Sequence, residues 1–106
     1  MSTKEIDLKR LGYVLVSNCG RSIRVEVGDT YQELAQYKPG RTVHPRVTLR
    51  FAGGVRKQVP VKDIVFTAWC GIIPTTMEVY HLDGDPDNNR VGNLSIRNIS
   101  DIKGQK

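Results

Sequence analysis

Cysteine is scarce in this 106-residue chain, and long apolar runs are absent from it. Its two cysteines, Cys19 and Cys70, are too few for a disulfide scaffold or a four-cysteine zinc site. We expect two reduced thiols in a cytosolic protein, because disulfides persist mainly in oxidising compartments. No stretch reaches the roughly 18 apolar residues of a membrane span, and the polar start MSTKEIDLKR lacks the apolar segment of a secretory signal. The length suits one small domain with a single core.

Positive charge is concentrated in the first part of the chain. Residues 1–74 carry twelve Lys or Arg and six Asp or Glu, whereas residues 75–106 carry four and five. Seven basic residues and no acidic one lie between Leu34 and Lys62. Such a block attracts anions and suits a phosphate backbone, although a solvated basic surface without a partner explains it equally well. His44 lies in this block, and we expect an exposed loop histidine there.

Alternating apolar and polar residues predict strands at residues 12–17, 23–27, 46–51 and 55–59. Asn18-Cys19-Gly20 and Gly53-Gly54 separate consecutive strands and are typical of tight turns. The second hairpin should have one apolar and one basic face, formed by Val47, Leu49 and Phe51 against Arg46, Thr48 and Arg50.

One helix is predicted, over residues 61–70 (VKDIVFTAWC). Pro60 suits a helix start, and the apolar residues that follow form one stripe, so the helix should be short and largely buried. We expect Trp69, beside this stripe, to pack in the core rather than to stack on a base. Residues 30–45 stay open between helix and loop, because Tyr31 and Leu34 have helical spacing but Pro39 and Gly40 stop any helix.

Residues 78–94, EVYHLDGDPDNNRVGNL, concentrate the side chains that can do chemistry. A short strand at 78–80 leads to His81, which we expect to be exposed in a tight polar loop. Asp and Asn side chains there can bond their own backbone, and Asn93 is placed to hold the two ends of the loop together. Residues 95–97 can pair back as a second strand, and Ser100 can cap a last helix of about one turn.

Three interpretations of this loop compete. Asp83, Asp85 and Asp87 suggest a calcium loop, but Pro86 and the missing glutamate at the twelfth position contradict the EF-hand pattern. The second interpretation is a purely structural loop that carries a solvated histidine. The third is a nuclease hairpin.

The third interpretation is supported by a resemblance to a known family. The loop resembles the HNH endonuclease motif, on which nine residues fall: His81, Asp83, Gly84, Asp85, Asn88, Asn89, Arg90, Asn93 and Leu94. Upstream, GYVLVSNCGRSIRV resembles the opening of the NUMOD4 module. The stretch between them is similar to the one that joins this module to HNH in phage-type homing endonucleases, so the resemblance covers residues 11–98.

The resemblance implies an α+β fold. A small β-rich N-terminal module with a short buried helix would precede a ββα-metal hairpin that docks in the DNA minor groove and has a truncated final helix. We therefore expect a polar, disordered N-terminus at 1–10, a NUMOD4-like basic DNA-binding part at 11–74 and an HNH-like motif at 75–106, in one folding unit. The expected location is the cytoplasm of a bacterial or phage-infected cell.

The resemblance also assigns roles to residues. His81 would be the general base that activates water, as an imidazole titrates near neutral pH. One Mg²⁺ or Mn²⁺ ion would bind the scissile phosphate. Asp83, Gly84, Asn89 and Asn93 would build the loop. Double-stranded DNA would be the partner, contacted through nine basic residues: Arg21, Arg24, Arg41, Arg46, Arg50, Arg56, Lys57, Arg90 and Arg97.

Two positions depart from the family pattern. Tyr80 stands where the family has an Asp or His metal ligand, and a neutral phenol is a poor Mg²⁺ ligand. Ile102 stands at the second ligand position, where Asp101, one residue away, is only a weak substitute. Asp83 or Asp85 could instead supply a metal ligand by a shifted geometry. The resemblance thus implies a DNA nicking enzyme that is weakened or inactive. The alternative is a catalytically dead binding module that regulates or inhibits through DNA or a protein partner. No heptad pattern indicates an oligomer.

Overall fold

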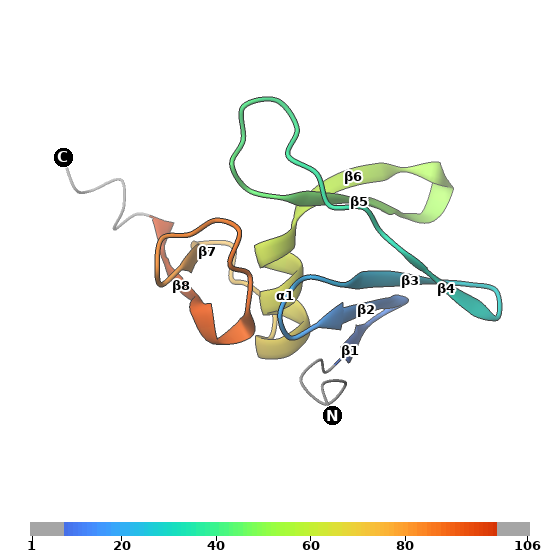
Figure 1. Cartoon of the computed structure of the whole chain (residues 1–106), viewed down its shortest axis with the longest axis horizontal. Helices are drawn as coiled ribbons and strands as arrows, with labels where there is room; N and C mark the ends of the chain where they lie inside the picture. The colour runs from blue at the N-terminus through green and yellow to red at the C-terminus, as the bar shows by residue number, and fades with distance from the viewer. Residues whose placement is uncertain (1–7, 100–106) are drawn as a thin grey trace.

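The computed structural model describes residues 8–99. Three antiparallel sheets surround one α-helix there, so the fold is mixed α+β with strands dominating (Figure 1). The strands are β1 (Leu8–Leu11), β2 (Val14–Ser17), β3 (Ile23–Val27), β4 (Thr30–Glu33), β5 (Arg46–Arg50), β6 (Arg56–Pro60), β7 (Met77–His81) and β8 (Leu94–Asn98). Helix α1 spans Val61–Cys70, and the short 3₁₀ turns η2 and η3 span Ala52–Gly54 and Val91–Asn93.

Strands β1 to β4 form one sheet in chain order. Strand β1 corrects the prediction of a disordered segment for residues 8–10, because Lys9 and Arg10 pair with Val16 and Leu15 of β2. Residues 30–33, which the sequence left open between helix and loop, form strand β4. Gly28 takes a positive φ of 60° in the turn, and the chain then returns along β3. In both places, pairing with a neighbouring strand outweighs the local signal.

Strands β5 and β6 form the predicted hairpin, closed by Gly53 and Gly54, each with φ 79°. Val47 is fully buried, as expected of its apolar face. Phe51 does not continue that face. It follows the strand at the turn and is 45% exposed, with Lys57 over its ring at 5.9 Å.

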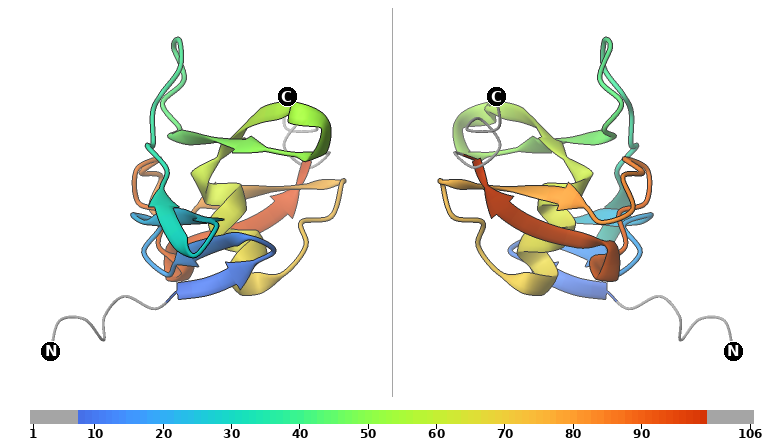
Figure 2. Two further views of the ribbon diagram at one scale, coloured as in Figure 1. Left: turned by 90° about the vertical axis from the view of Figure 1, so that its right-hand side faces the viewer. Right: turned by 90° about the vertical axis from the view of Figure 1, so that its left-hand side faces the viewer.

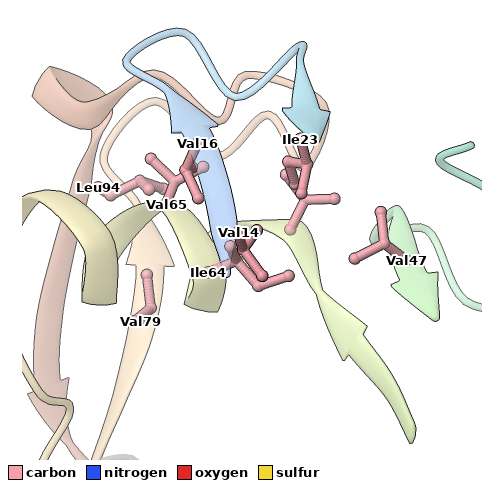
Figure 3. Packing of buried hydrophobic residues seen from close by; sticks show 9 residues of the cluster. Val14, Val16, Ile23, Val47, Ile64, Val65, Val79 and Leu94 are labelled. Carbon is pink, nitrogen blue, oxygen red and sulfur yellow. The ribbon is translucent and has the colours of Figure 1, made fainter. Parts of the chain in front are cut away.

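Helix α1 has the predicted bounds and lies between the β1–β4 sheet and the β7–β8 hairpin (Figure 1). Val61, Ile64 and Val65 are buried, and Val65 faces Val16 and Leu94 (Figure 3). The helix ends at Gly71, whose φ of 120° favours glycine and whose N–H bonds the carbonyls of the last turn. The core thus packs the β1–β4 sheet and the β7–β8 hairpin against one helix.

Trp69 is half-buried, and its indole Nε1 donates a hydrogen bond of 3.1 Å to the Val16 carbonyl. This bond holds the ring against β2, in keeping with packing rather than base stacking. Among residues 8–99, no helix is long and apolar enough to cross a membrane.

Strands β7 and β8 pair from Met77 with Asn98 to His81 with Leu94, so the loop of residues 82–93 begins and ends at one edge of the hairpin. The predicted last helix, with Ser100, Asp101 and Ile102, lies outside the described residues.

Candidate functional site

His81 is the last residue of β7, and its side chain is buried rather than exposed as the sequence suggested, at 8% exposure. Its Nε2 lies 2.7 Å from Oδ1 of Asn89, which is itself 3% exposed. Because an amide oxygen only accepts, Nε2 is the donor in this hydrogen bond, and in the neutral ring Nδ1 then carries the lone pair. The neutral ring held in this way has Nδ1 as its hydrogen-bond acceptor.

Asn93 joins the two ends of the loop, as its place in the sequence predicts. Its Oδ1 accepts from the backbone N–H of Asp83 at 3.2 Å. Its Nδ2 donates to Oδ1 of Asp83 and to the carbonyl of Asn88, both at 2.9 Å. Three hydrogen bonds from one amide thus close the loop beside His81.

The Asp83 carboxylate serves the same loop. Besides Asn93, it accepts from Nδ2 of Asn88 and from the backbone N–H of Asp85, both at 2.8 Å. These bonds, that from Asn88 foremost, lower the pKa of Asp83 to about 2. Both carboxylate oxygens are engaged within the loop, and Gly84 beside them provides the turn with φ 78°.

The other loop carboxylates do not converge on one point. Asp85 accepts from the backbone N–H of Asp87 at 3.0 Å, and Asp87 forms an ion pair of 2.8 Å with Lys38. Within residues 8–99, no group of three or more His, Cys, Asp or Glu side chains could hold a metal ion. A calcium loop therefore has no ligand set in this region.

A second histidine, His44, is half-buried against the first, rather than exposed in its loop as the sequence suggested. His44 belongs to a loop that stands out from the body (Figure 2) and is closed by paired backbone bonds between Tyr37 and Arg46. Its ring stacks on His81 with 5.5 Å between centroids and 15° between planes. Burial, and then the positive charge of Lys62, lower the pKa of His44, which favours the neutral ring.

A cleft of about 410 Å³ opens beside the two rings. Lys62, at the start of α1, borders it and donates to the Val79 carbonyl at 2.9 Å. Arg97 borders it from β8, pairs with Glu78 at 3.2 Å and lies 4.6 Å from the centre of the Tyr80 ring. Two cations and the Glu78 carboxylate therefore line the cleft together with His81.

The described residues do not fit the Mg²⁺ or Mn²⁺ site that the resemblance implies. Tyr80 offers a phenol whose ring is covered by a guanidinium, and Asp83 uses both oxygens within the loop. In the cleft beside them, the Glu78 carboxylate is paired with Arg97, and Lys62 adds a further positive charge. Asp101 lies outside the described residues.

The nine predicted DNA-contact residues fall into two groups. Arg24 and Arg97 form ion pairs with Glu33 and Glu78, and Lys57 covers Phe51. The other six form no ion pair within the part of the chain that the structure describes: Arg21, Arg41, Arg46, Arg50, Arg56 and Arg90. Arg50 and Arg56 are cross-strand partners and share a face of the β5–β6 hairpin with Arg46.

Part of the chain that contains this site is similar to known proteins. Residues 61–101 match the family model HNH_3, described as HNH endonuclease. The match starts at α1 rather than at residue 75, and it contains His81, Asn89 and Asn93. No curated protein matches the chain.

Among solved structures, the chain is similar to one described as "DNA binding and cleavage by the HNH homing endonuclease I-HmuI". The TM-score is 0.68 at 27% sequence identity, over 89% of this chain and 52% of that chain. The chain therefore spans about half the length of the protein it resembles.

Proposed function

We propose that this chain binds double-stranded DNA and presents a phosphodiester to His81 in an HNH-type site whose hydrolytic activity is weak. The pair of His81 and Asn89 carries the proposal, because it fixes a proton acceptor inside the segment that matches HNH endonucleases. DNA binding and cleavage are described for the similar homing endonuclease, I-HmuI, which favours the same substrate here.

In the proposed step, Nδ1 of His81 takes a proton from a water molecule as its oxygen attacks phosphorus. The bond from phosphorus to the leaving nucleotide oxygen then breaks, and that oxygen leaves with the electron pair. Lys62 and Arg97 border the cleft and can donate to the non-bridging phosphate oxygens. We assign no metal step, because the described ligand set does not fit one. The leaving oxygen therefore has no assigned stabiliser, which is our reason for weak hydrolysis.

The basic residues would hold the duplex. We propose that residues 11–74 act as the NUMOD4-like DNA-binding part, with Arg46, Arg50 and Arg56 on one face of the β5–β6 hairpin. Arginines without an ion pair can contact phosphates, which position a duplex without reading its sequence.

A binding module without cleavage is the second candidate. Arg97 over the Tyr80 ring and the hydrogen bonds to Asp83 within the loop favour it, because both compete with metal coordination. Such a module would bind DNA, or a protein partner, and act as a regulator or inhibitor.

A nicking assay on supercoiled plasmid tests the proposal. The natural chain, His81→Ala and the exposed-surface control Gln32→Ala are compared in Mn²⁺, in Mg²⁺ and in EDTA, with duplex affinity measured alongside. We expect slow nicking by the natural chain and the control, none above background by His81→Ala, and equal DNA binding by all three. Equal nicking by His81→Ala would contradict the proposed base. Tight, salt-sensitive binding without any nicking would select the second candidate.

A further inference from the structure

The turn between β2 and β3 packs against the residue that holds His81. Gly20, in this turn, has φ 74°, and a Cβ built on it would lie 2.7 Å from the Asn89 carbonyl oxygen and 2.8 Å from the Asn89 Cβ. Real Cβ atoms do not approach other atoms so closely. Glycine is therefore needed at this position for the contact with Asn89 as well as for the backbone angle.

Hydrogen bonds with neighbouring residues of the N-terminal part of the chain fix the conformation of this turn. The backbone N–H of Gly20 donates to the Ser17 carbonyl at 3.1 Å, and the Ser17 hydroxyl accepts from the N–H of Ser22 at 3.0 Å. Ser17 is fully buried. The Gly20 carbonyl accepts from Nε2 of Gln36 at 2.8 Å. These bonds fix where the surface of Gly20 meets the loop.

The turn is also tied to the loop directly. The Asn18 carbonyl accepts from the backbone N–H of Val91 at 2.9 Å. Asn89 is thus held between the turn on one side and His81 on the other, with its Oδ1 2.7 Å from Nε2. A hydrogen bond of this kind weakens steeply once the heavy atoms separate beyond about 3.5 Å, so a displacement of Asn89 by a methyl group is enough to lose it.

We propose that the Asn18–Gly20 turn, which lies upstream of the segment matching HNH endonucleases, positions the proton acceptor of that segment. Gly20 sets the place of Asn89, and Asn89 keeps the proton on Nε2 of His81, which leaves Nδ1 free to accept. Gly20 and Asn89 are positioning residues in this account. The consequence for DNA hydrolysis rests on the proposed function, but the effect on the imidazole does not.

The test compares Gly20→Ala with Gly28→Ala. Both glycines have positive φ, 74° and 60°, so both variants carry backbone strain, but nothing lies within 4 Å of a Cβ at Gly28. The tautomer of His81 is read at pH 8 from its ¹⁵N shifts. The chain has two histidines, so His44→Gln assigns the signals. We expect one Nε2–H tautomer in the natural chain and Gly28→Ala, and a mixture in Gly20→Ala and Asn89→Ala.

If Gly20→Ala does not fold, a milder pair of variants provides the test. Gln36→Ala removes the bond to the Gly20 carbonyl without adding an atom, and the exposed Gln32→Ala is its control. We expect a partial loss of the Nε2–H tautomer in Gln36→Ala and none in Gln32→Ala. A natural tautomer in folded Gly20→Ala, or in Gln36→Ala where Gly20→Ala does not fold, would overturn the proposal.

The nicking assay separates this inference from the proposed function. If the natural chain nicks, Gly20→Ala should lose at least tenfold in rate with duplex affinity unchanged within twofold. If the tautomer changes but no variant nicks, the positioning role stands and the proposed hydrolysis fails.

Discussion

The two sides of the His81 ring differ in composition. On the Nε2 side, the ring meets Asn89 and a loop whose amides and carboxylate bond one another, braced by the Asn18–Gly20 turn. We call this the held side. On the other side lie His44 and the cleft with Lys62 and Arg97, which we call the open side.

The hydrogen bond that orients the His81 ring and the ligands that a metal ion would need lie on different sides of the ring, so one can be present without the other. The held side has the bonds that a proton acceptor needs. On the open side, the Glu78 carboxylate that lines the cleft is paired with Arg97, and Arg97 also covers the Tyr80 ring. Neither group is free to serve as a metal ligand in this arrangement. The proposed function follows this division, with DNA binding and an oriented imidazole but slow hydrolysis.

The largest expected effect on stability comes from breaking the held side at Asn93. Asn93→Ala removes three hydrogen bonds and should lower the free energy of unfolding by about 3 kcal/mol, because each bond contributes roughly 1 kcal/mol. Urea unfolding measures this, with the exposed Gln58→Ala as control. A change as small as that of the control would mean that the loop does not depend on Asn93.

A smaller effect is expected from the stacked ring on the open side. His44→Ala should lower the free energy of unfolding by about 1 kcal/mol, the usual contribution of an aromatic pair. It should leave the His81 tautomer unchanged, because the acceptor of the Nε2 proton is Asn89 rather than His44. Urea unfolding and the ¹⁵N shifts check the two parts, and a changed tautomer would show that both sides orient the ring.

The Asp83 carboxylate makes the held side sensitive to acid. Its pKa of about 2 lies below the usual 3.8, so its bonds stabilise the fold above pH 3.8, and that contribution is lost as the pH falls toward 2. Asp83→Asn should therefore flatten the fall of the urea midpoint between pH 4 and pH 2. Asp29→Asn, in the exposed β3–β4 turn, is the control. An unchanged slope in Asp83→Asn would contradict the assigned bonds.

The smallest expected effect concerns the cations of the open side. Lys62→Gln removes one cation from the cleft, so the dependence of log affinity on log salt should flatten by about 0.9. Lys9→Gln is the control, because Lys9 lies over Trp69 at 5.4 Å, away from the cleft. Titration of a short duplex at several salt concentrations in EDTA measures the slope. Equal slopes for Lys62→Gln and the natural chain would exclude a phosphate from this cleft.

Local pattern predicted much of the fold. The apolar stripe after Pro60 gave the bounds of α1, and the spacing from His81 to Leu94 indicated the β7–β8 hairpin and its loop. Strands β1 and β4 were missed, because their residues become strands only by pairing with β2 and β3.

The contacts around His81 could not be predicted from local sequence patterns. The stacking of His44 and the approach of Gly20 to Asn89 join residues far apart in the chain, and periodicity carries no information on such contacts. The glycine of the Asn18–Gly20 turn was a signal, but it indicated a turn angle rather than a close packing partner.

The nicking rate of Tyr80→Asp tests the central claim, that the base is oriented while the open side limits hydrolysis. In Mn²⁺, Tyr80→Asp should nick supercoiled plasmid at least tenfold faster than the natural chain. EDTA, or the added change His81→Ala, should abolish the gain. A natural chain that already nicks as fast as Tyr80→Asp would contradict the account, because Tyr80 would then not limit the reaction.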